Sequence, residues 1–173
     1  MKNLAILCLF ALSAVAVHAA DLKVGDPAPE FTLQGSDGNS YTLSQFKGKQ
    51  AVVLAWFPRA FTSGCTVECK SLADNGDKIR QYDVTYFMAS VDPLEENISF
   101  AQSTGADFPL LSDPSREVAE AYGVLQGGAF ARRVTFYIGI DGMVLKIDSQ
   151  VNPATSAQDM VATLGELGVA RAK

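Results

Sequence analysis

Two cysteines, Cys65 and Cys69, stand in the segment of this sequence that is best suited to chemistry. The segment begins at Pro58, contains Thr62, and directly follows a continuous run of apolar residues. A thiol reacts as its thiolate, and a free thiol has a pKa of about 8.5, so a reactive cysteine needs neighbours that stabilise the anion. The pattern predicts a nucleophilic sulfur at Cys65, and the alternative is a buried, inert cysteine.

The first residues of the chain have a different character. Lys2, the apolar run 4–17 and the small residues Val17 and Ala19 form the pattern of a secretory signal that is cleaved after Ala19. A membrane anchor is the alternative, but about 14 apolar residues fall short of the roughly 20 that span a bilayer. We therefore expect a signal peptide over 1–19 and an exported, periplasmic protein.

Cleavage would remove His18, the single histidine of the chain, and Cys8, one of its three cysteines. The two remaining cysteines are too few for a structural zinc site with four Cys and His ligands. Hydrolases with an imidazole base and haem bound by a histidine are excluded as well. We expect a protein without a metal and without a cofactor.

Without histidine, the activation of Cys65 must come from the fold around it. We expect Pro58 to end a strand, Gly64 to allow a tight turn, and Cys65 to lie on the first turn of the next helix. Free N–H groups at a helix N-terminus favour an anion, and a nearby arginine adds to this effect. The Thr62 hydroxyl can donate to the sulfur or to an oxygen of a bound peroxide. Peroxide reduction requires such a thiolate and such donors.

The elements that must position this segment alternate between strands and helices. Apolar runs predict buried strands over residues 51–57, 84–91 and 109–111, helices over 66–79, 94–103, 116–122 and 156–167, and hairpins over 31–43 and 134–147. This order indicates a parallel central sheet with helices on both faces, to which the later hairpin adds antiparallel edge strands. We expect an α/β, thioredoxin-like fold with a mixed central sheet, an N-terminal hairpin and one domain from 21 to 173.

Composition limits the partners. The formal net charge is −5 and 48% of the residues are apolar, which is enough for a sizeable core. An acidic chain without basic runs is poorly suited to nucleic acid or to an anionic membrane surface. We therefore expect neither as a partner.

Pro58, Thr62 and Cys65 have the spacing Pro-x-x-x-Thr-x-x-Cys, which matches the active-site signature of the peroxiredoxins. The wider stretch from Trp56 to Glu68 resembles the Q-type, or bacterioferritin-comigratory-protein, branch of that family. Similarity also covers residues 25–31, 91–92, 108–114 and 133–138, and so most of the mature chain. The resemblance implies a thiol peroxidase that reduces hydrogen peroxide and organic hydroperoxides. A monomer is the common state of the branch.

The same resemblance implies roles for single residues. Cys65 would become a sulfenic acid, Thr62 would bind the peroxide, and Pro58 would shield the sulfenic acid. Arg133 would favour the thiolate, and the neighbouring Arg132 is the competing candidate; because adjacent strand residues point to opposite faces, only one of them is expected to reach the site.

Two further side chains have open roles. Glu68 either orients the arginine or is an exposed helix acid.

In the Q-type branch a resolving cysteine often follows the first one by five residues, whereas Cys69 follows Cys65 by four. Residues i and i+4 of a helix have Cβ atoms about 5–6 Å apart, but a disulfide requires about 3.5–4.5 Å. Cys69 is therefore a resolving cysteine that needs the helix to unwind, an inert cysteine, or half of a structural disulfide.

If Cys69 resolves, a thioredoxin-like dithiol partner would restore both thiols by exchange. Two other functions remain possible for the chain. One is a thiol–disulfide oxidoreductase of the thioredoxin type, although such proteins have two residues between their cysteines and this chain has three. The other is a non-enzymatic binding domain on a thioredoxin-like scaffold.

Overall fold

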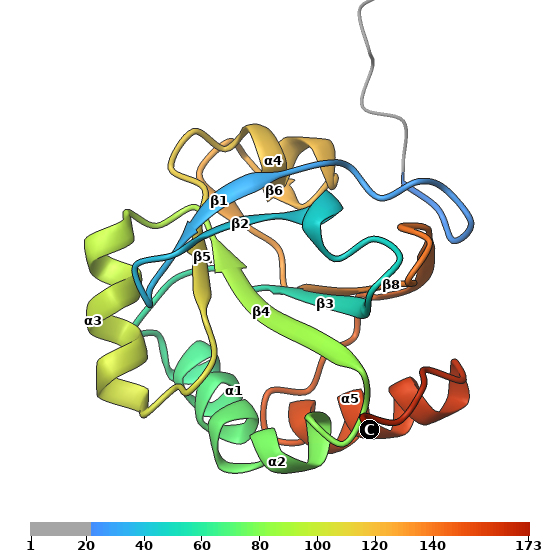
Figure 1. Cartoon of the computed structure of the whole chain (residues 1–173). Helices are drawn as coiled ribbons and strands as arrows, with labels where there is room; N and C mark the ends of the chain where they lie inside the picture. Colours follow the sequence, from blue (N-terminus) through green and yellow to red (C-terminus); the bar gives the residue numbers. More distant parts are fainter. Residues whose placement is uncertain (1–21) are drawn as a thin grey trace, which may run out of the picture.

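The computed structural model describes residues 22–173, so the predicted signal peptide over 1–19 lies outside the described part of the chain. Its centre is a seven-stranded mixed sheet with the strand order β2-β1-β5-β4-β3-β8-β9 (Figure 1). These strands are β1 (Thr32–Gly35), β2 (Ser40–Thr42), β3 (Ala51–Trp56), β4 (Val84–Ser90), β5 (Leu110–Ser112), β8 (Val134–Ile138) and β9 (Val144–Asp148). The expected thioredoxin-like α/β fold is confirmed.

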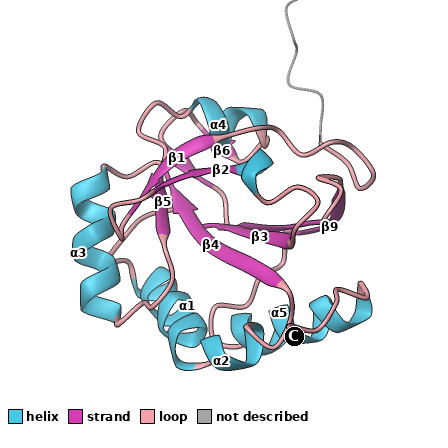
Figure 2. Cartoon of the chain, viewed as in Figure 1, coloured by secondary structure: helices cyan, strands magenta, loops and turns pink. Residues whose placement is uncertain are grey.

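Helices cover both faces of this sheet, but unequally. The helices are α1 (Ser63–Asp74), α2 (Gly76–Ile79), α3 (Leu94–Thr104), α4 (Glu117–Ala121) and α5 (Ser156–Glu166), with a short 3-10 helix at Leu43–Gln45. Helices α1, α2, α3 and α5 lie together on one side, and α4 lies on the other (Figures 1 and 2). The larger helical layer therefore lies on the same side of the sheet as α1.

Strand directions decide which chain segments meet at the end of β3. Strands β3, β4 and β5 are parallel, whereas β8 is antiparallel to β3. The later hairpin was expected at the edge, but β8 lies inside the sheet between β3 and β9, and β9 alone of the two is an edge strand. Because Val134 pairs with Trp56, Arg133, which is the residue before β8, lies beside the carboxyl end of β3.

Strand β3 is buried on both faces, as its continuous apolar run predicts. Val53, Ala55 and Phe57 belong to the core under α1, α3 and α5, and Val52, Leu54 and Trp56 belong to the opposite core. This alternation follows from the two-residue period of a strand. The strand is therefore fixed from both sides at the point where the chain leaves it for α1.

The helix predicted over 66–79 is two helices. The first of them, α1, begins earlier than predicted, at Ser63, and ends at Asp74. The next residue, Asn75, leaves the helical conformation with φ −123°. The Asn75 amide donates to the carbonyl of Ser71 at 2.9 Å and so satisfies one of the last carbonyls of α1. At Gly76 a Cβ would meet Arg80 and the Tyr86 hydroxyl at 2.6–2.7 Å, so this position has no room for a side chain.

Helix α1 buries one face that sequence reasoning did not identify. Its buried residues are Cys65, Glu68, Cys69 and Leu72, which have the i, i+3, i+4, i+7 spacing of one helical stripe. Val67 is not part of this face, because it is 46% exposed. Both cysteines and a carboxylate therefore point toward the sheet.

A short ribbon of β6 (Leu125–Gln126) and β7 (Phe130–Ala131) was not predicted. Gly127 and Gly128 form its turn with φ of 57° and 68°, which glycine adopts readily. This Gly-Gly pair between Gln126 and Ala129 was the available signal. Within residues 22–173, no helix combines the length and the apolar character needed to cross a membrane.

Candidate active site

Cys65 lies on the first turn of α1, as predicted, and its side chain is 1% exposed. Thr62 is the residue that precedes the helix, and its carbonyl accepts the first helical hydrogen bond, from the N–H of Thr66 at 2.9 Å. The N–H groups before Thr66 have no carbonyl partner within the helix. These N–H groups and the helix dipole favour negative charge on a sulfur at this position.

The turn that directs the chain into α1 is made at Phe61 and not at Gly64. Phe61 has φ 61°, a left-handed conformation that non-glycine residues adopt rarely, and its ring is 53% exposed. Gly64 lies inside the helix and has no positive φ. The expected tight turn is therefore present, but a different residue makes it.

The segment between β3 and α1 is held by a carboxylate from the next strand. Asp92 is buried just beyond the end of β4, and its Oδ2 accepts a hydrogen bond from the backbone N–H of Ala60 at 2.9 Å. Pro58 is half-buried and is the second residue after β3. The parallel pairing of β3 with β4 brings their carboxyl ends together, which is why Asp92 reaches this loop.

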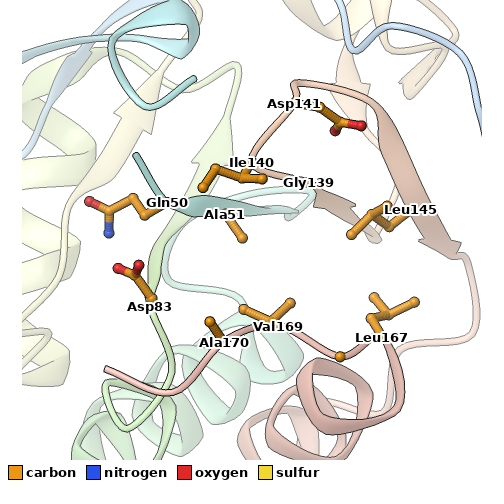
Figure 3. A pocket seen from close by; sticks show the side chains of 11 residues that line it. Gln50, Ala51, Asp83, Gly139, Ile140, Asp141, Leu145, Leu167, Val169 and Ala170 are labelled. Carbon is orange, nitrogen blue, oxygen red and sulfur yellow. The ribbon is translucent and has the colours of Figure 1, made fainter. Parts of the chain in front are cut away.

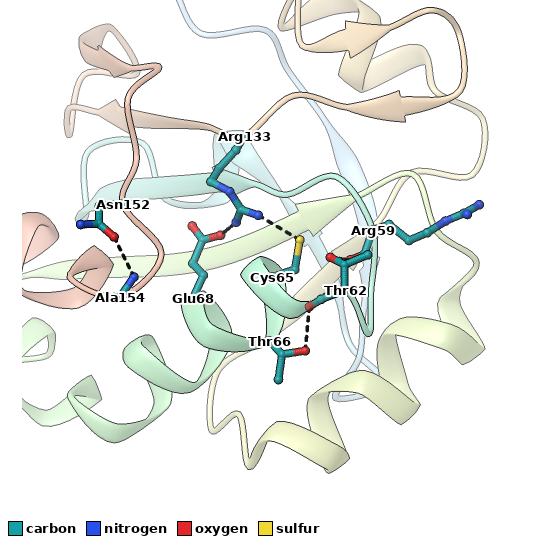
Figure 4. Close-up of polar contacts among 8 residues, drawn as sticks. All are labelled: Arg59, Thr62, Cys65, Thr66, Glu68, Arg133, Asn152 and Ala154. Carbon is teal, nitrogen blue, oxygen red and sulfur yellow. Dashed lines mark hydrogen bonds and ion pairs between the residues drawn. The ribbon is translucent and has the colours of Figure 1, made fainter.

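Arg133 contacts the Cys65 sulfur (Figure 4). Its Nη2 donates to Cys65 Sγ at 3.1 Å, and its Nη1 donates to Glu68 Oε2 in an ion pair. The Glu68 side chain is fully buried, and its Oε1 has no partner among the described residues. Glu68 is therefore no exposed helix acid. It contacts the arginine, which is the arrangement that an orienting role requires.

Arg132 points elsewhere, although it is the neighbour of Arg133. Its Nη2 donates to the carbonyl of Gly123 at 2.6 Å. The expectation that only one of the two arginines reaches the site agrees with these contacts. Both residues precede β8, so they diverge in the loop that leads into the strand.

Gly64 provides room for the guanidinium. A Cβ built at this position would lie 3.3 Å from Arg133 Nη2, which is closer than nine in ten real contacts of a Cβ atom. It would also lie 3.9 Å from Pro153, a residue of the loop before α5. Glycine at this position therefore lets the arginine approach the first turn of α1.

The Thr62 hydroxyl does not donate to the sulfur. Its Oγ1 donates to the carbonyl of Arg59 at 2.9 Å (Figure 4). The lone pairs of Oγ1 remain available as acceptors. Of the two roles expected for this hydroxyl, binding of a peroxide is compatible with this geometry, through a hydrogen bond that the peroxide donates.

Cys69 is fully buried one turn below Cys65, and both thiols are free. Its Sγ lies 3.1 Å from Oγ1 of Thr104, the last residue of α3. Burial raises the pKa of the Cys69 thiol to about 11, an effect that the negative charge of Cys65 increases and the Thr104 contact reduces. Cys69 is therefore protonated at neutral pH in this conformation.

A hollow of the described surface lies apart from these residues. A cavity of about 310 Å³ lies beside the start of β3, and Ala51, Leu145 and Val169 contribute to its apolar wall (Figure 3). None of the predicted site residues lines it. Cys65 follows the other end of β3, so this cavity is not part of the candidate site.

The site residues predicted from the sequence all come from the segment 58–69 or from the strand entry beside it, and they are Cys65, Thr62, Pro58, Arg133 and Cys69. Sequence reasoning gave no role to Asp92 or Thr104. Asp92 was noticed only as part of the strand end 91–92. For Thr104 no local signal exists, because its contact joins residues 35 positions apart.

Comparisons with known proteins show the family to which this chain is similar. A model of the AhpC/TSA family matches residues 24–147. Peroxiredoxin Bcp of Escherichia coli K12 is 36% identical over 130 residues, which cover 71% of this chain and 83% of that protein. Alkyl hydroperoxide reductase E of Mycobacterium bovis is 36% identical over 126 residues, which cover 71% of this chain and 82% of that protein.

Two solved structures illustrate the similarity of the folds. Peroxidoxin BcpB from Mycobacterium tuberculosis superposes with a TM-score of 0.77 at 32% identity, covering 84% of this chain and 97% of its own. A PrxQ variant from Xylella fastidiosa superposes with a TM-score of 0.79 at 23% identity, covering 86% and 99%. At this lower identity the second comparison concerns the fold alone.

Proposed function

Because the chain belongs to the AhpC/TSA family and to its bacterioferritin-comigratory-protein branch, it is a peroxiredoxin, and we propose that Cys65 is its peroxidatic cysteine. The contact that carries this proposal is the 3.1 Å hydrogen bond from Arg133 Nη2 to Cys65 Sγ. A guanidinium at this distance and the N-terminus of α1 both favour a thiolate. The second cysteine has neither neighbour.

In the first step the Cys65 thiolate attacks the hydrogen-bearing oxygen of a hydroperoxide. An S–O bond forms, the O–O bond breaks, and the other oxygen leaves with the electron pair and takes up a proton as water or an alcohol. The sulfur is oxidised to a sulfenic acid while the peroxide is reduced. Arg133 is positioned to stabilise the charge that develops on the peroxide oxygens.

Thr62 and Pro58 complete this proposed site. The Thr62 proton is directed to the Arg59 carbonyl, so the hydroxyl oxygen accepts a hydrogen bond from the peroxide and orients it. Pro58 lies at the exit of β3 and shields the sulfenic acid from solvent. The name of the mycobacterial relative, an alkyl hydroperoxide reductase, supports organic hydroperoxides as substrates beside hydrogen peroxide.

We further propose that Cys69 resolves the sulfenic acid. Its sulfur attacks Cys65 Sγ, the S–S bond forms, and the S–O bond breaks with release of water. A thioredoxin-like dithiol then reduces this disulfide. The full burial of Cys69 supports a cysteine that acts within the chain, and it argues against the alternative of a thioredoxin-type enzyme that exchanges disulfides with other proteins.

Export and a monomeric state remain part of the proposal. Export rests on the signal pattern of residues 1–19, and the reductant would then be a dithiol protein of the same oxidising compartment. Intact-mass measurement of the protein recovered from a periplasmic extract would locate the cleavage site. Light scattering would determine its molar mass in solution.

The decisive experiment follows peroxide consumption by the mature protein with dithiothreitol as the donor. Wild type is expected to consume hydrogen peroxide and cumene hydroperoxide, and Cys65→Ser is expected to lose all of this activity. Cys69→Ser is the matched control, because it keeps the attacking thiol and should still form one sulfenic acid that reacts with dimedone. Wild-type protein without peroxide consumption, or Cys65→Ser protein with full activity, would contradict the proposal.

A further inference from the structure

Two side chains on one face of α3 contact the active-site segment in the conformation described above. Phe100 and Thr104 are one helical turn apart and therefore share a face. The Phe100 ring lies 5.2 Å from the ring of Phe61, the strained residue before α1. The Thr104 hydroxyl lies 3.1 Å from Cys69 Sγ. Helix α3 thus contacts the active-site segment on both sides of Cys65.

The hydrogen bond between Cys69 and Thr104 has a definite direction. Thr104 Oγ1 lies 2.8 Å from the carbonyl oxygen of Phe100 and 3.2 Å from that of Ala101, so its own proton is directed to the backbone of α3. The Cys69 thiol is therefore the donor, and the Thr104 oxygen is the acceptor. Both side chains are buried, where an unpaired polar group is unfavourable.

This contact must break before a disulfide can form. The Cβ atoms of residues four apart on a helix are about 5–6 Å apart, farther than the 3.5–4.5 Å of a disulfide. Cys69 must therefore leave its place beside α3 while the turn between the two cysteines opens. Every contact that α3 makes with Cys69 stabilises the closed helix against this opening.

We propose that Thr104 is a positioning residue that limits how often α1 opens, and thereby limits the rate at which Cys69 reaches Cys65. The second part rests on the proposed resolving role of Cys69, whereas the first part does not. A slower resolving step leaves the sulfenic acid exposed to a second peroxide for longer. Thr104 would then set the peroxide concentration at which Cys65 is oxidised to the sulfinic acid.

The first experiment measures the opening without peroxide chemistry. In a Cys65→Ser background Cys69 is the reactive thiol of the mature chain, and its alkylation by N-ethylmaleimide reports exposure. Thr104→Val keeps the shape of the side chain but removes the acceptor, and it should raise the alkylation rate about fivefold, the effect of one lost hydrogen bond. Thr104→Ser restores the hydroxyl and should return the rate to that of the parent.

Ser103→Ala is the matched control on the same helix. Exposed Ser103 donates to the Phe100 carbonyl at 2.8 Å, the same kind of bond that Thr104 makes within α3. This variant should leave the alkylation of Cys69 unchanged. Equal rates in the parent and in Thr104→Val, or an equal increase in Ser103→Ala, would overturn the proposal.

The second experiment uses the mature protein with both cysteines. After one equivalent of peroxide, mass spectrometry should show the disulfide forming about fivefold faster in Thr104→Val, with unchanged consumption of peroxide in the first step. With excess peroxide this variant should contain less sulfinic acid than wild type. If alkylation responds as expected but no protein forms a disulfide, the control of α1 by Thr104 stands and the resolving role of Cys69 fails.

Discussion

At the scale of single residues, the site depends on one arginine whose two terminal nitrogens donate hydrogen bonds to two different partners. Arg133 donates from Nη2 to the Cys65 sulfur and from Nη1 to the buried Glu68. The carboxylate fixes the plane of the guanidinium, so that the second nitrogen is directed at the sulfur. A lysine has one compact charge without this fixed geometry and would not serve both partners equally.

Replacing Arg133 by glutamine should slow the oxidation of Cys65 by peroxide about 100-fold, because a charged donor to the reacting atoms is lost. The rate is measured by stopped-flow competition with a peroxidase of known rate. Arg132→Gln is the matched control, since this neighbour donates to the Gly123 carbonyl, and it should change the rate less than about threefold. Equal losses in the two variants would contradict the assigned contact.

Gly64 offers a second test at this scale. A methyl group at this position would lie 3.3 Å from Arg133 Nη2, so the guanidinium must move by a few tenths of an ångström, which we expect to disturb its contact with the sulfur. Gly64→Ala should therefore slow Cys65 oxidation about 10-fold, an effect of misplacement by a fraction of an ångström. Helix stability should not fall, because alanine favours a helix more than glycine does. Ser63→Ala, at the exposed preceding position, should leave the rate unchanged.

At the scale of elements, α1 has contacts with different functions along its length. Its first turn presents Cys65 to Arg133, and its second turn packs Cys69 against α3. Both cysteines belong to the same buried stripe, which ends at Leu72. The helix therefore combines a reactive N-terminus with a packed face, and its stability should depend on the protonation of a thiol inside that face.

Burial raises the pKa of the Cys69 thiol from 9.0 to about 11, so stability should fall with rising pH. Below pH 8 the thiol is protonated in both the folded and the unfolded chain. Between pH 9 and 11 the unfolded chain releases this proton while the folded chain retains it, which favours unfolding.

Urea unfolding under reducing conditions at pH 8 and pH 10.5 measures this effect. Wild type should lose about 2 kcal/mol more stability over this interval than Cys69→Ala. The variant is the proper reference because the buried tyrosines titrate in both proteins. An identical loss in the two proteins would show that the Cys69 thiol is not protected from ionisation by the fold.

At the scale of the whole molecule, the two ends of the central sheet have separate tasks. The carboxyl ends of β3 and β4 bear Cys65 and Asp92, whereas their starts are covered by the last residues of the chain. There the N–H of Asp83 donates to the Ala170 carbonyl at 2.7 Å, and the Arg171 guanidinium lies 4.1 Å from the centre of the Tyr82 ring. This end contributes stability without contacting the site.

Deletion of residues 169–173 should therefore lower the free energy of unfolding by about 3 kcal/mol, from three lost backbone hydrogen bonds and one cation–π contact. The rate of Cys65 oxidation at 25 °C should remain within a factor of two of wild type. Deletion of Lys173 alone is the control and should change neither quantity. A large loss of oxidation rate in the folded truncated protein would contradict the separation of the two ends.

The short-range pattern of the sequence was sufficient for the reactive segment and for most elements. A continuous apolar run, a proline and a cysteine soon after it predict a buried strand that leads into a helix with the sulfur on its first turn, because these features depend on neighbouring residues. The alternation of strands and helices was likewise sufficient for the mixed sheet. The break of the helix at Asn75 was missed, because the apolar spacing continues across it from Leu72 to Ile79.

The contacts of the reactive residues were decided by the tertiary structure, although the family resemblance already favoured Arg133 over Arg132. The contact of Arg133 with Cys65 joins residues 68 positions apart, and that of Thr104 with Cys69 joins residues 35 positions apart. Neither can be read from local spacing, since the first depends on the register of β8 against β3 and the second on the packing of α3 against α1. The sequence by itself thus determined that Cys65 is a candidate nucleophile at a helix start. The packing of distant elements determined which arginine contacts it, that Glu68 is buried beside this arginine, and that Cys69 is bound to α3, because these relations arise only when the elements come together.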